Sequence, residues 1–316
     1  GVMERYVLTV TLNAAVDVAY TVPGFSPGGI HVAAAVRRVA GGKGNNVARV
    51  LARLGVRVAA TGFAGGAAGR FIQDELRRAG VVPEYVEVAG ESRTCYAFTD
   101  PETGVVTELR ERGPELGPED VARFKARYDR LLAGAELVTI SGSVPPGVEP
   151  EIYRYLIERA RSCQVRVVLD SSGQPLREAL VARPYVVKPN RAELAGWAGR
   201  PLETEADVLE AARRMRTAGP EWVLVSLGAD GALLVGPDGA GAWRAVPPQV
   251  AALNPVGSGD SAVAGLACGL VRGLGPEELL RQAVACGTAN ARTAGVADVD
   301  PAEVERLARR VRVEPV

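Results

Sequence analysis

Two short apolar runs, Leu137-Val138-Thr139-Ile140 and Val165-Arg166-Val167-Val168-Leu169, flank the amphipathic stretch Pro150–Ser162. The runs are rich in aliphatic and β-branched residues, which is typical of buried strands, whereas the stretch between them has the apolar spacing of a helix. A strand, a helix and a second strand in this order predict two parallel strands whose connecting helix packs on one face of the sheet.

The same alternation runs through most of the chain. Further strands are expected at Tyr6–Leu12, Val56–Thr61, Tyr185–Val187 and Trp222–Ser226, and further helices at Asn45–Leu54, Gly69–Ala79, Pro118–Leu132, Glu203–Ala218, Ser258–Val271, Pro276–Thr293 and Pro301–Val311. The strands are continuous apolar runs, as in parallel sheets that helices cover on both faces. We therefore expect a doubly wound, mostly parallel α/β sheet, with residues 1–316 forming one domain.

Two insertions, at about residues 14–40 and 88–112, have alternating β-type sequence and no helical pattern. The turn Pro101-Glu102-Thr103-Gly104 favours a hairpin within the second insertion. Paired into a small sheet beside the carboxyl ends of the main strands, where open α/β sheets bind ligands, the insertions would form a lid. Its apolar residues exceed what a small sheet buries alone, so we expect two lids to pair in a homodimer. These residues are Val18, Tyr20, Val22, Tyr96 and Phe98.

Composition excludes several classes of protein. The 37 Lys and Arg residues balance 37 Asp and Glu residues, which disfavours binding to nucleic acid or to a membrane surface. The longest uncharged apolar stretch, Ser261–Val271, is too short to span a bilayer. The four cysteines lack CxxC spacing, one histidine accompanies them, and the chain does not start with a secretory pattern. We therefore expect a cytoplasmic protein.

The strongest local signal is Asn254-Pro255-Val256-Gly257-Ser258-Gly259-Asp260-Ser261, which leads directly into a helix. The glycines on either side of Ser258 permit a tight turn, and the unpaired N–H groups of the first helical turn can then bind an anion. Asp260 places a carboxylate beside this anion site, which suits a general base for a hydroxyl that attacks a phosphoryl group. The residues are equally compatible with a plain helix cap by Ser258 or Asp260.

A second glycine-rich turn, Gly41-Gly42-Lys43-Gly44, precedes the helix expected from Asn45. Its glycines allow a ligand to approach the backbone, while Lys43 and Asn46 offer a cation and an amide. The turn has neither the spacing of a phosphate-binding Walker loop nor that of a dinucleotide-binding loop, so it also fits a helix start without a ligand.

The segment Lys188-Pro189-Asn190-Arg191-Ala192-Glu193 follows an expected strand. Asn190 and Glu193 have the spacing of a capping box, which would only stabilise a helix start. An amide and a carboxylate in this position can also hold Mg²⁺ through water molecules. A third segment, Ser226-Leu227-Gly228-Ala229-Asp230-Gly231, by itself predicts a turn between two strands.

Taken together and in this order, these segments resemble the ribokinase-like (PfkB) sugar kinase family over about residues 7–290. The resemblance is carried by Thr11-Leu12-Asn13 with Asp17, Gly41-Gly42-Lys43-Gly44 with Asn46, Ser141-Gly142-Ser143, Lys188-Pro189-Asn190 with Glu193, Ser226 to Gly231, and Gly257-Ser258-Gly259-Asp260. It implies the ribokinase-like α/β fold with a β-sheet lid and an ATP-dependent kinase that requires Mg²⁺. A dehydrogenase on a Rossmann sheet is disfavoured, because Thr11-Leu12-Asn13 stands where the GxGxxG turn would be.

Within the family, Gly42-Lys43-Gly44 and Thr11-Leu12-Asn13 look like the branch that phosphorylates ketohexose phosphates, which comprises 1-phosphofructokinases and tagatose-6-phosphate kinases. The 254–261 segment, Cys95 and Arg110 look more like the latter, whereas Ala14 replaces a proline usual in both. The resemblance thus favours phosphorylation of D-tagatose 6-phosphate at C1. The alternatives are a 1-phosphofructokinase and a sugar-phosphate-binding regulator with the same fold.

The resemblance also implies a role for each matching residue. Asp260 would be the catalytic base, with the backbone of Gly257, Ser258 and Gly259 stabilising the transferred phosphoryl group. The phosphosugar would contact Asp17, Gly41, Gly42, Lys43, Asn46, Arg93 and Ser143. ATP would contact Lys188, Asn190, Ser226, Gly228, Gly231, Gly257, Gly259 and Asn290, the last near the adenine. Asn190 and Glu193 would hold Mg²⁺ through water.

Overall fold

The computed structural model describes residues 5–316, and its main sheet matches the predicted alternation. The strands are β1 (Tyr6–Thr11), β4 (Val58–Ala64), β5 (Val82–Pro83), β6 (Val86–Glu87), β9 (Ala135–Ser141), β10 (Val167–Asp170), β11 (Val186–Val187), β12 (Trp222–Ser226), β13 (Ala232–Val235), β14 (Ala242–Val246) and β15 (Arg312–Pro315). Their order is β15-β14-β13-β12-β11-β10-β9-β1-β4-β5, and β6 pairs with β4. All pairs from β5 to β12 are parallel, and β13 to β15 add an antiparallel edge. The prediction of a mostly parallel sheet is confirmed.

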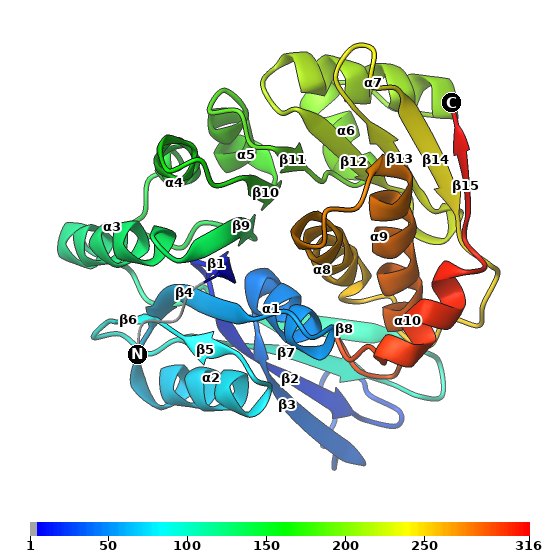
Figure 1. Cartoon of the computed structure of the whole chain (residues 1–316). Helices are drawn as coiled ribbons and strands as arrows, with labels where there is room; N and C mark the ends of the chain where they lie inside the picture. The colour runs from blue at the N-terminus through cyan, green and yellow to red at the C-terminus, as the bar shows by residue number, and fades with distance from the viewer. Residues whose placement is uncertain (1–4) are drawn as a thin grey trace.

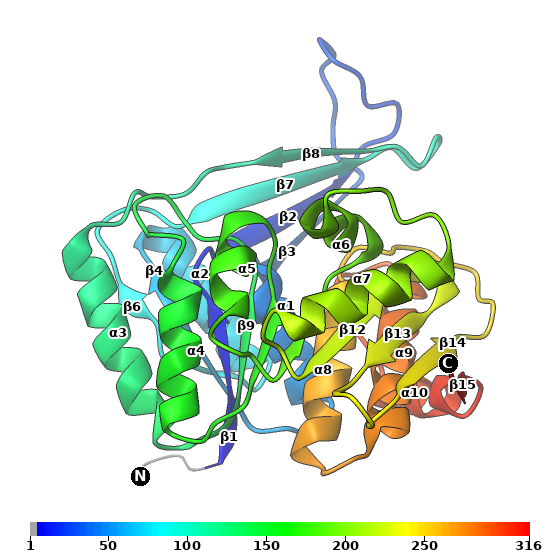
Figure 2. The ribbon, with the colours of Figure 1, turned by 90° about the horizontal axis from the view of Figure 1, so that it is seen from above.

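Helices cover both faces of this sheet (Figures 1 and 2). One face carries α1 (Lys43–Arg53), α2 (Gly66–Arg78), α8 (Ser258–Val271), α9 (Pro276–Ala291) and α10 (Pro301–Ala308), and the other carries α3 (Pro118–Leu132), α4 (Ile152–Ser162), α5 (Gly173–Leu180), α6 (Arg191–Ala198) and α7 (Glu205–Thr217). Each face has its own apolar core. Because side chains alternate along a strand, Val7 of β1 packs in the first core and Leu8 and Val10 pack in the second. The doubly wound arrangement is therefore confirmed.

A second sheet contains β2 (Ala15–Thr21), β3 (Ala35–Gly41), β7 (Arg93–Thr99) and β8 (Val106–Arg110), in the order β3-β2-β7-β8. We call it the lid. It confirms the predicted small sheet, and Figure 2 shows it lying across one end of the main sheet. This is the end at which β1 and its parallel neighbours finish, so the lid covers the edge where ligands of such sheets bind.

The apolar face of the lid differs from the prediction. Val18 and Val22 are buried, and Tyr20 stacks on Phe98 with ring centroids 5.5 Å apart. Phe25, from the loop after β2, also stacks on Phe98, with ring centroids 5.1 Å apart. The aromatic residues thus cover one another within one chain. The exposed apolar side chains of the lid region are Ile30, Val32, Val36, Val105, Val106 and Leu109.

The sequence prediction omitted helices α5 and α6 and strands β5, β6, β14 and β15. Helices α5 and α6 have eight residues each, too few for a clear apolar period, and Pro175 lies within the first. Strand β15 is an exposed edge strand with polar residues, and its partner β14 lies more than sixty residues away. Such a strand depends on a distant partner rather than on local sequence.

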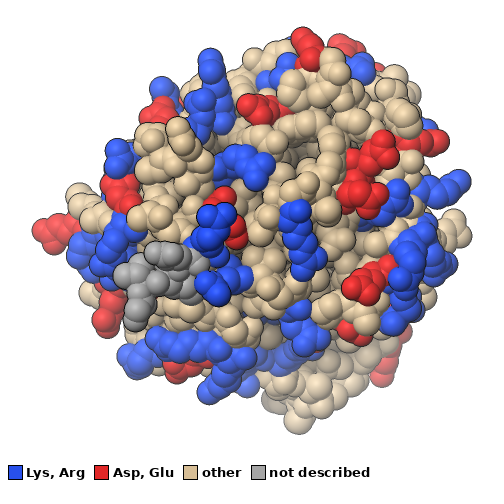
Figure 3. Space-filling model, viewed as in Figure 1, with Lys and Arg blue, Asp and Glu red and all other residues tan. Residues whose placement is uncertain are grey.

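The mixed surface charge and the lack of a long apolar helix among the described residues agree with the expectations from composition. On the face drawn in Figure 3, acidic side chains are interspersed with the basic ones. Among the helices of residues 5–316, none combines the length and the apolar character that a bilayer span requires.

Buried Asn45 connects the start of α1 to two neighbouring elements. Its Nδ2 donates to the carbonyl of Gly41 at 2.8 Å. Its Oδ1 accepts from the hydroxyl of Tyr85 at 2.5 Å and from that of Thr11 at 3.4 Å. These bonds hold the glycine-rich turn before α1 against the end of β1.

We expect Asn45→Ala to lower the free energy of unfolding by ~3 kcal/mol, because it leaves the buried Tyr85 hydroxyl without its acceptor and frees the turn. Tyr85→Phe removes a single donor, and we expect a loss of ~1 kcal/mol. Urea unfolding of the two variants measures the difference. Equal losses would mean that Asn45 does not connect these elements.

Candidate active site

A cleft of about 560 Å³ opens between the lid and the carboxyl ends of the main strands. Predicted site residues from every part of the chain line it: Asp17, Gly42, Lys43, Asn46, Arg93, Ser143, Glu193, Gly257, Gly259 and Asp260. They meet because the parallel strands end, and the helices after them begin, at the same edge of the sheet.

The amino-terminal end of α8 forms one wall of this cleft. Gly257, the residue before the helix, has φ = 88°, a left-handed conformation that glycine adopts without strain. The N–H of Ser258 donates to a preceding carbonyl, whereas the N–H groups of Gly259 and Asp260 lie in the first turn and have no acceptor within the helix. Two amide donors and the positive end of the helix dipole therefore face the cleft, as in an anion site.

Asp260 is buried beside these amides, with 6% of its surface exposed. Its Oδ2 accepts a hydrogen bond of 2.9 Å from Nδ2 of Asn46. Burial raises the pKa of the Asp260 carboxyl to about 6, against the attraction of the Lys43 ammonium. A carboxyl group with this pKa is deprotonated at neutral pH yet basic enough to accept a proton from a hydroxyl.

Two lysines approach the same buried carboxylate, that of Asp170. Its Oδ2 lies 4.0 Å from Nζ of Lys43 and 3.7 Å from Nζ of Lys188. Lys43 is half exposed to the cleft, and Asp170 is the main cause of its raised pKa. Lys188 is buried behind Gly259, where a Cβ would lie 3.2 Å from the ammonium. Glycine at this position therefore lets a cation approach the start of α8.

The sequence analysis did not single out Asp170. Its side chain is 1% exposed, and neither oxygen has a hydrogen-bond partner among the described residues. The signal was present, because this acidic residue directly follows the buried run Val167-Val168-Leu169 at the carboxyl end of β10. Its role is visible only when the distant Lys43 and Lys188 are placed beside it.

The lid contributes basic side chains to the opposite wall. Arg93 of β7 donates to the carbonyl of Asn13 at 2.8 and 3.2 Å, which ties the lid to the segment after β1. The side chain of Asn13 in turn donates to Oγ of Ser143 at 2.9 Å. Arg37 and Arg110, from β3 and β8, also line the cleft.

Asp17 of β2 faces the glycine-rich turn. A Cβ at Gly41 would lie 2.0 Å from its Oδ2, so only glycine leaves room for this carboxylate. Burial raises the pKa of the Asp17 carboxyl, and the guanidinium groups of Arg49 and Arg93 oppose the rise. The acid thus sits between the cationic lid and the turn that carries Lys43.

Asn190 and Glu193 form the capping box of α6, as one of the two interpretations predicted. Oδ1 of Asn190 accepts from the N–H of Glu193 at 2.7 Å, and Oε1 of Glu193 accepts from the N–H of Asn190 at 2.9 Å. Glu193 nevertheless lines the cleft. Within residues 5–316, no group of three or more acidic, His or Cys side chains could hold a metal ion. Mg²⁺ would therefore need water and phosphate oxygens as additional ligands, which is its usual coordination.

The remaining predicted nucleotide contacts lie outside the cleft lining. Ser226 pairs with Asn190 in an isolated bridge, so the two segments are adjacent. A turn between two strands was predicted here, and Gly228–Asp230 form a short 3₁₀ turn between β12 and β13, with φ = 98° at Gly231.

Asn290 of α9, which is expected near the adenine, makes all its side-chain contacts within the protein. It is fully buried, and its Nδ2 donates to the carbonyl of Val256 at 2.9 Å and to Oγ of Ser258 at 3.0 Å. Its Oδ1 accepts from the N–H of Ala297 at 2.7 Å. The whole amide therefore supports the loop before α8 and is not presented to the cleft.

Comparison with known proteins agrees with this geometry. The pfkB family of carbohydrate kinases matches residues 8–303. Phosphofructokinase-2 from Escherichia coli, solved with fructose 6-phosphate, is 31% identical, with a TM-score of 0.88 over 97% of this chain and 99% of that one. A possible 1-phosphofructokinase from Thermotoga maritima is 29% identical, with a TM-score of 0.90 over 98% and 99%. Ribokinase from Arabidopsis thaliana shares the fold, at 22% identity and a TM-score of 0.79 over 97% and 99%.

These matches cover nearly the whole chain, and they agree with the ribokinase-like fold and with a phosphotransferase rather than a regulator without chemistry. The chain belongs to the pfkB family of carbohydrate kinases and is a phosphofructokinase-like sugar kinase.

Proposed function

We propose that the protein transfers the γ-phosphoryl group of MgATP to the C1 hydroxyl of a ketohexose 6-phosphate, with D-tagatose 6-phosphate as the preferred acceptor and tagatose 1,6-bisphosphate as the product. The observation that carries this proposal is the position of Asp260, a buried carboxylate beside unpaired amides in a cleft with basic walls. We place this reaction in the cytoplasm, in keeping with the balanced charge of the sequence.

The reaction follows from that position. Asp260 accepts the proton of the C1 hydroxyl while its oxygen attacks the γ-phosphorus, and the bond to the β-phosphate oxygen breaks to release ADP. The N–H groups of Gly259 and Asp260 stabilise the charge on the equatorial oxygens, an effect commonly worth ~3 kcal/mol per donor. Lys188, behind Gly259, adds a positive charge at the same place.

The sugar phosphate is bound at the lid end of the cleft. Lys43, Arg93 and Arg110 supply cations on two walls, and charge-assisted bonds to phosphate are stronger than bonds to neutral groups. Asp17, opposite the turn, accepts hydrogen bonds from the sugar hydroxyls. The lid excludes water when it closes, which limits wasteful hydrolysis of ATP.

The nucleotide lies toward α6 and the turn after β12. Asn190 and Glu193 would hold Mg²⁺ through water, and the bound ion would supply positive charge against the triphosphate. Ser226, Gly228 and Gly231, which lie at the end of β12 and in the turn after it, beside Asn190, contact ATP.

A second candidate acceptor is fructose 1-phosphate, because the Thermotoga neighbour is described as a possible 1-phosphofructokinase. The two phosphates stand at opposite ends of the sugar, so the basic walls would bind a different end in each case. We expect kcat/KM to be highest for tagatose 6-phosphate, lower for fructose 6-phosphate and at least ~100-fold lower for fructose 1-phosphate, the loss of about two charged contacts. A coupled ADP-release assay measures the three values. A preference for fructose 1-phosphate would select the second candidate.

We expect Asp260→Asn to lower kcat by ~10²- to 10⁴-fold and to leave the affinity for ATP unchanged, since the amide cannot accept the proton. In the unaltered enzyme, kcat/KM should fall as the pH drops through about 6, where the Asp260 carboxyl becomes protonated. Asp74→Asn, an exposed carboxylate of α2, is the control and should retain full turnover. Near-normal turnover of Asp260→Asn would refute the assignment of the base.

We also propose a homodimer that pairs two lids. Ile30 and Val32 are 101% and 89% exposed, and Val106 and Leu109 are exposed on the outer strand β8. These side chains all belong to the lid region, and apolar surface left exposed in one part of a protein marks an interface. Escherichia coli phosphofructokinase-2 is known in a tetrameric form, so relatives of this chain do associate. We expect a dimer in sedimentation at micromolar concentration and a shift toward monomer for Leu109→Glu. A monomeric unaltered protein would contradict this interface.

A further inference from the structure

Asn46 and Arg49 lie one turn apart on α1, directly beneath the candidate base. Nη2 of Arg49 donates to Oδ1 of Asn46 at 2.6 Å, and Nδ2 of Asn46 donates to Oδ2 of Asp260 at 2.9 Å. A primary amide accepts only through its oxygen and donates only through its nitrogen. Arg49 therefore determines which end of the Asn46 side chain faces the Asp260 carboxylate.

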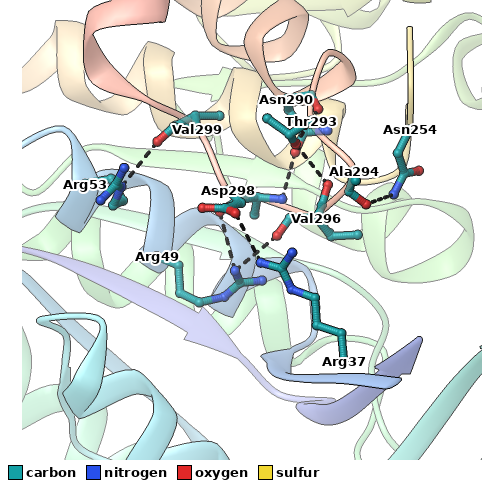
Figure 4. Close-up of polar contacts among 12 residues, drawn as sticks. Arg37, Arg49, Arg53, Asn254, Asn290, Thr293, Ala294, Val296, Asp298 and Val299 are labelled. Carbon is teal, nitrogen blue, oxygen red and sulfur yellow. Dashed lines mark hydrogen bonds and ion pairs between the residues drawn. The ribbon is translucent and has the colours of Figure 1, made fainter. Parts of the chain in front are cut away.

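The guanidinium of Arg49 is itself held on two other sides. Its Nε donates to the carbonyl of Ala40, and its Nη1 donates to the carbonyl of Val296 at 3.1 Å. Figure 4 shows three arginines from β3 and α1 reaching the same loop between α9 and α10. Arg37 pairs with Asp298 and Arg53 donates to the carbonyl of Val299. Arg49 alone of the three also contacts Asn46.

We propose that Arg49 is a positioning residue for Asp260: it orients the Asn46 amide so that Nδ2 holds one carboxylate oxygen and leaves the other to take the proton of the substrate. This inference rests on the proposed role of Asp260 as the base. It also changes the expected role of Asn46, whose amide is shared between Arg49 and Asp260 and is not available as a whole to the sugar.

A reversed amide would have a measurable consequence. With Oδ1 toward the carboxylate, two acceptors would face each other, which favours the protonated acid and raises its pKa. The other charged groups around Asp260 are Lys43 on α1, Asp170 at the end of β10 and Lys188 after β11, and none of them contacts the amide.

Arg49 has its own charged neighbours. They are Asp17 on β2, Arg37 on β3, Asp298 in the loop before α10 and Asp260 itself. A direct effect of the Arg49 charge on Asp260 must therefore be separated from an effect through the amide. Only the second disappears when Asn46 is already absent.

The test is a titration of the Asp260 carboxyl carbon by NMR on protein labelled with ¹³C-aspartate, with Asp260→Asn used to assign the signal. It needs no substrate, so it decides the inference even if the proposed reaction fails in the kinase assay. We expect Asn46→Ala and Arg49→Met each to raise the pKa by ~1, the size of one lost charge-assisted hydrogen bond. The double variant should show no more than the Asn46→Ala rise, because both changes remove the same bond.

The matched control is Arg53→Met, which removes a bond from the same helix to the same loop but touches neither Asn46 nor Asp260. It should leave the Asp260 titration unchanged. If Arg49→Met does not fold, Arg49→Lys replaces it. The guanidinium bonds Ala40, Val296 and Asn46 through three separate nitrogens, whose positions a single ammonium nitrogen cannot reproduce, so this variant should also raise the pKa of Asp260. An unchanged titration in the Arg49 variant, or rises that add in the double variant, would overturn the proposal.

Discussion

The candidate active site depends on one buried carboxylate, that of Asp260, which must stay ionised inside the protein. Asp260 is buried, which by itself favours its neutral form, yet it sits at the positive end of α8 with Lys43 nearby and a hydrogen bond from Asn46. These opposing effects place its pKa near 6 and make it both ionised and basic at neutral pH. Asp170 is part of the same group of charges. It pairs with Lys43 and Lys188 on the side of the cleft where phosphate charge would develop.

The main sheet and the lid contribute different groups to the candidate site. The main sheet and its helices fix the backbone amides and the buried acid, which need a rigid frame because catalysis by such groups falls off with small displacements. The lid supplies Arg93 and Arg110 from strands that pack less deeply, which suits the lid closure in the proposed reaction. The hydrogen bond from Arg93 to the carbonyl of Asn13 connects strand β7 of the lid to the segment that follows β1 of the main sheet.

Local sequence was a good guide where one segment carries the whole signal. The start of α8 was predicted at Ser258, and the glycine-rich turn, the 3₁₀ turn and the small sheet were also predicted, since glycine spacing and residue alternation are local properties. Helices α5 and α6 were missed because they are short, whereas the other failures involve residues that are distant in the sequence. Strand β15 pairs with the distant β14, and Asp170 lies beside two distant lysines. The amides of Asn46 and Asn290 bond to the distant Asp260 and Val256, which the sequence did not indicate.

The central claim is that Asp260 and the amides at the start of α8 act on the same transferring group. The most direct measurement is a crystal structure with ADP, the acceptor sugar phosphate and a fluoroaluminate that mimics the transferred phosphoryl group. The account predicts the acceptor hydroxyl at about 3 Å from the free oxygen of Asp260, with the planar mimic bonded to the N–H groups of Gly259 and Asp260. An acceptor hydroxyl directed away from that carboxylate, or a mimic bound without those amides, would contradict it.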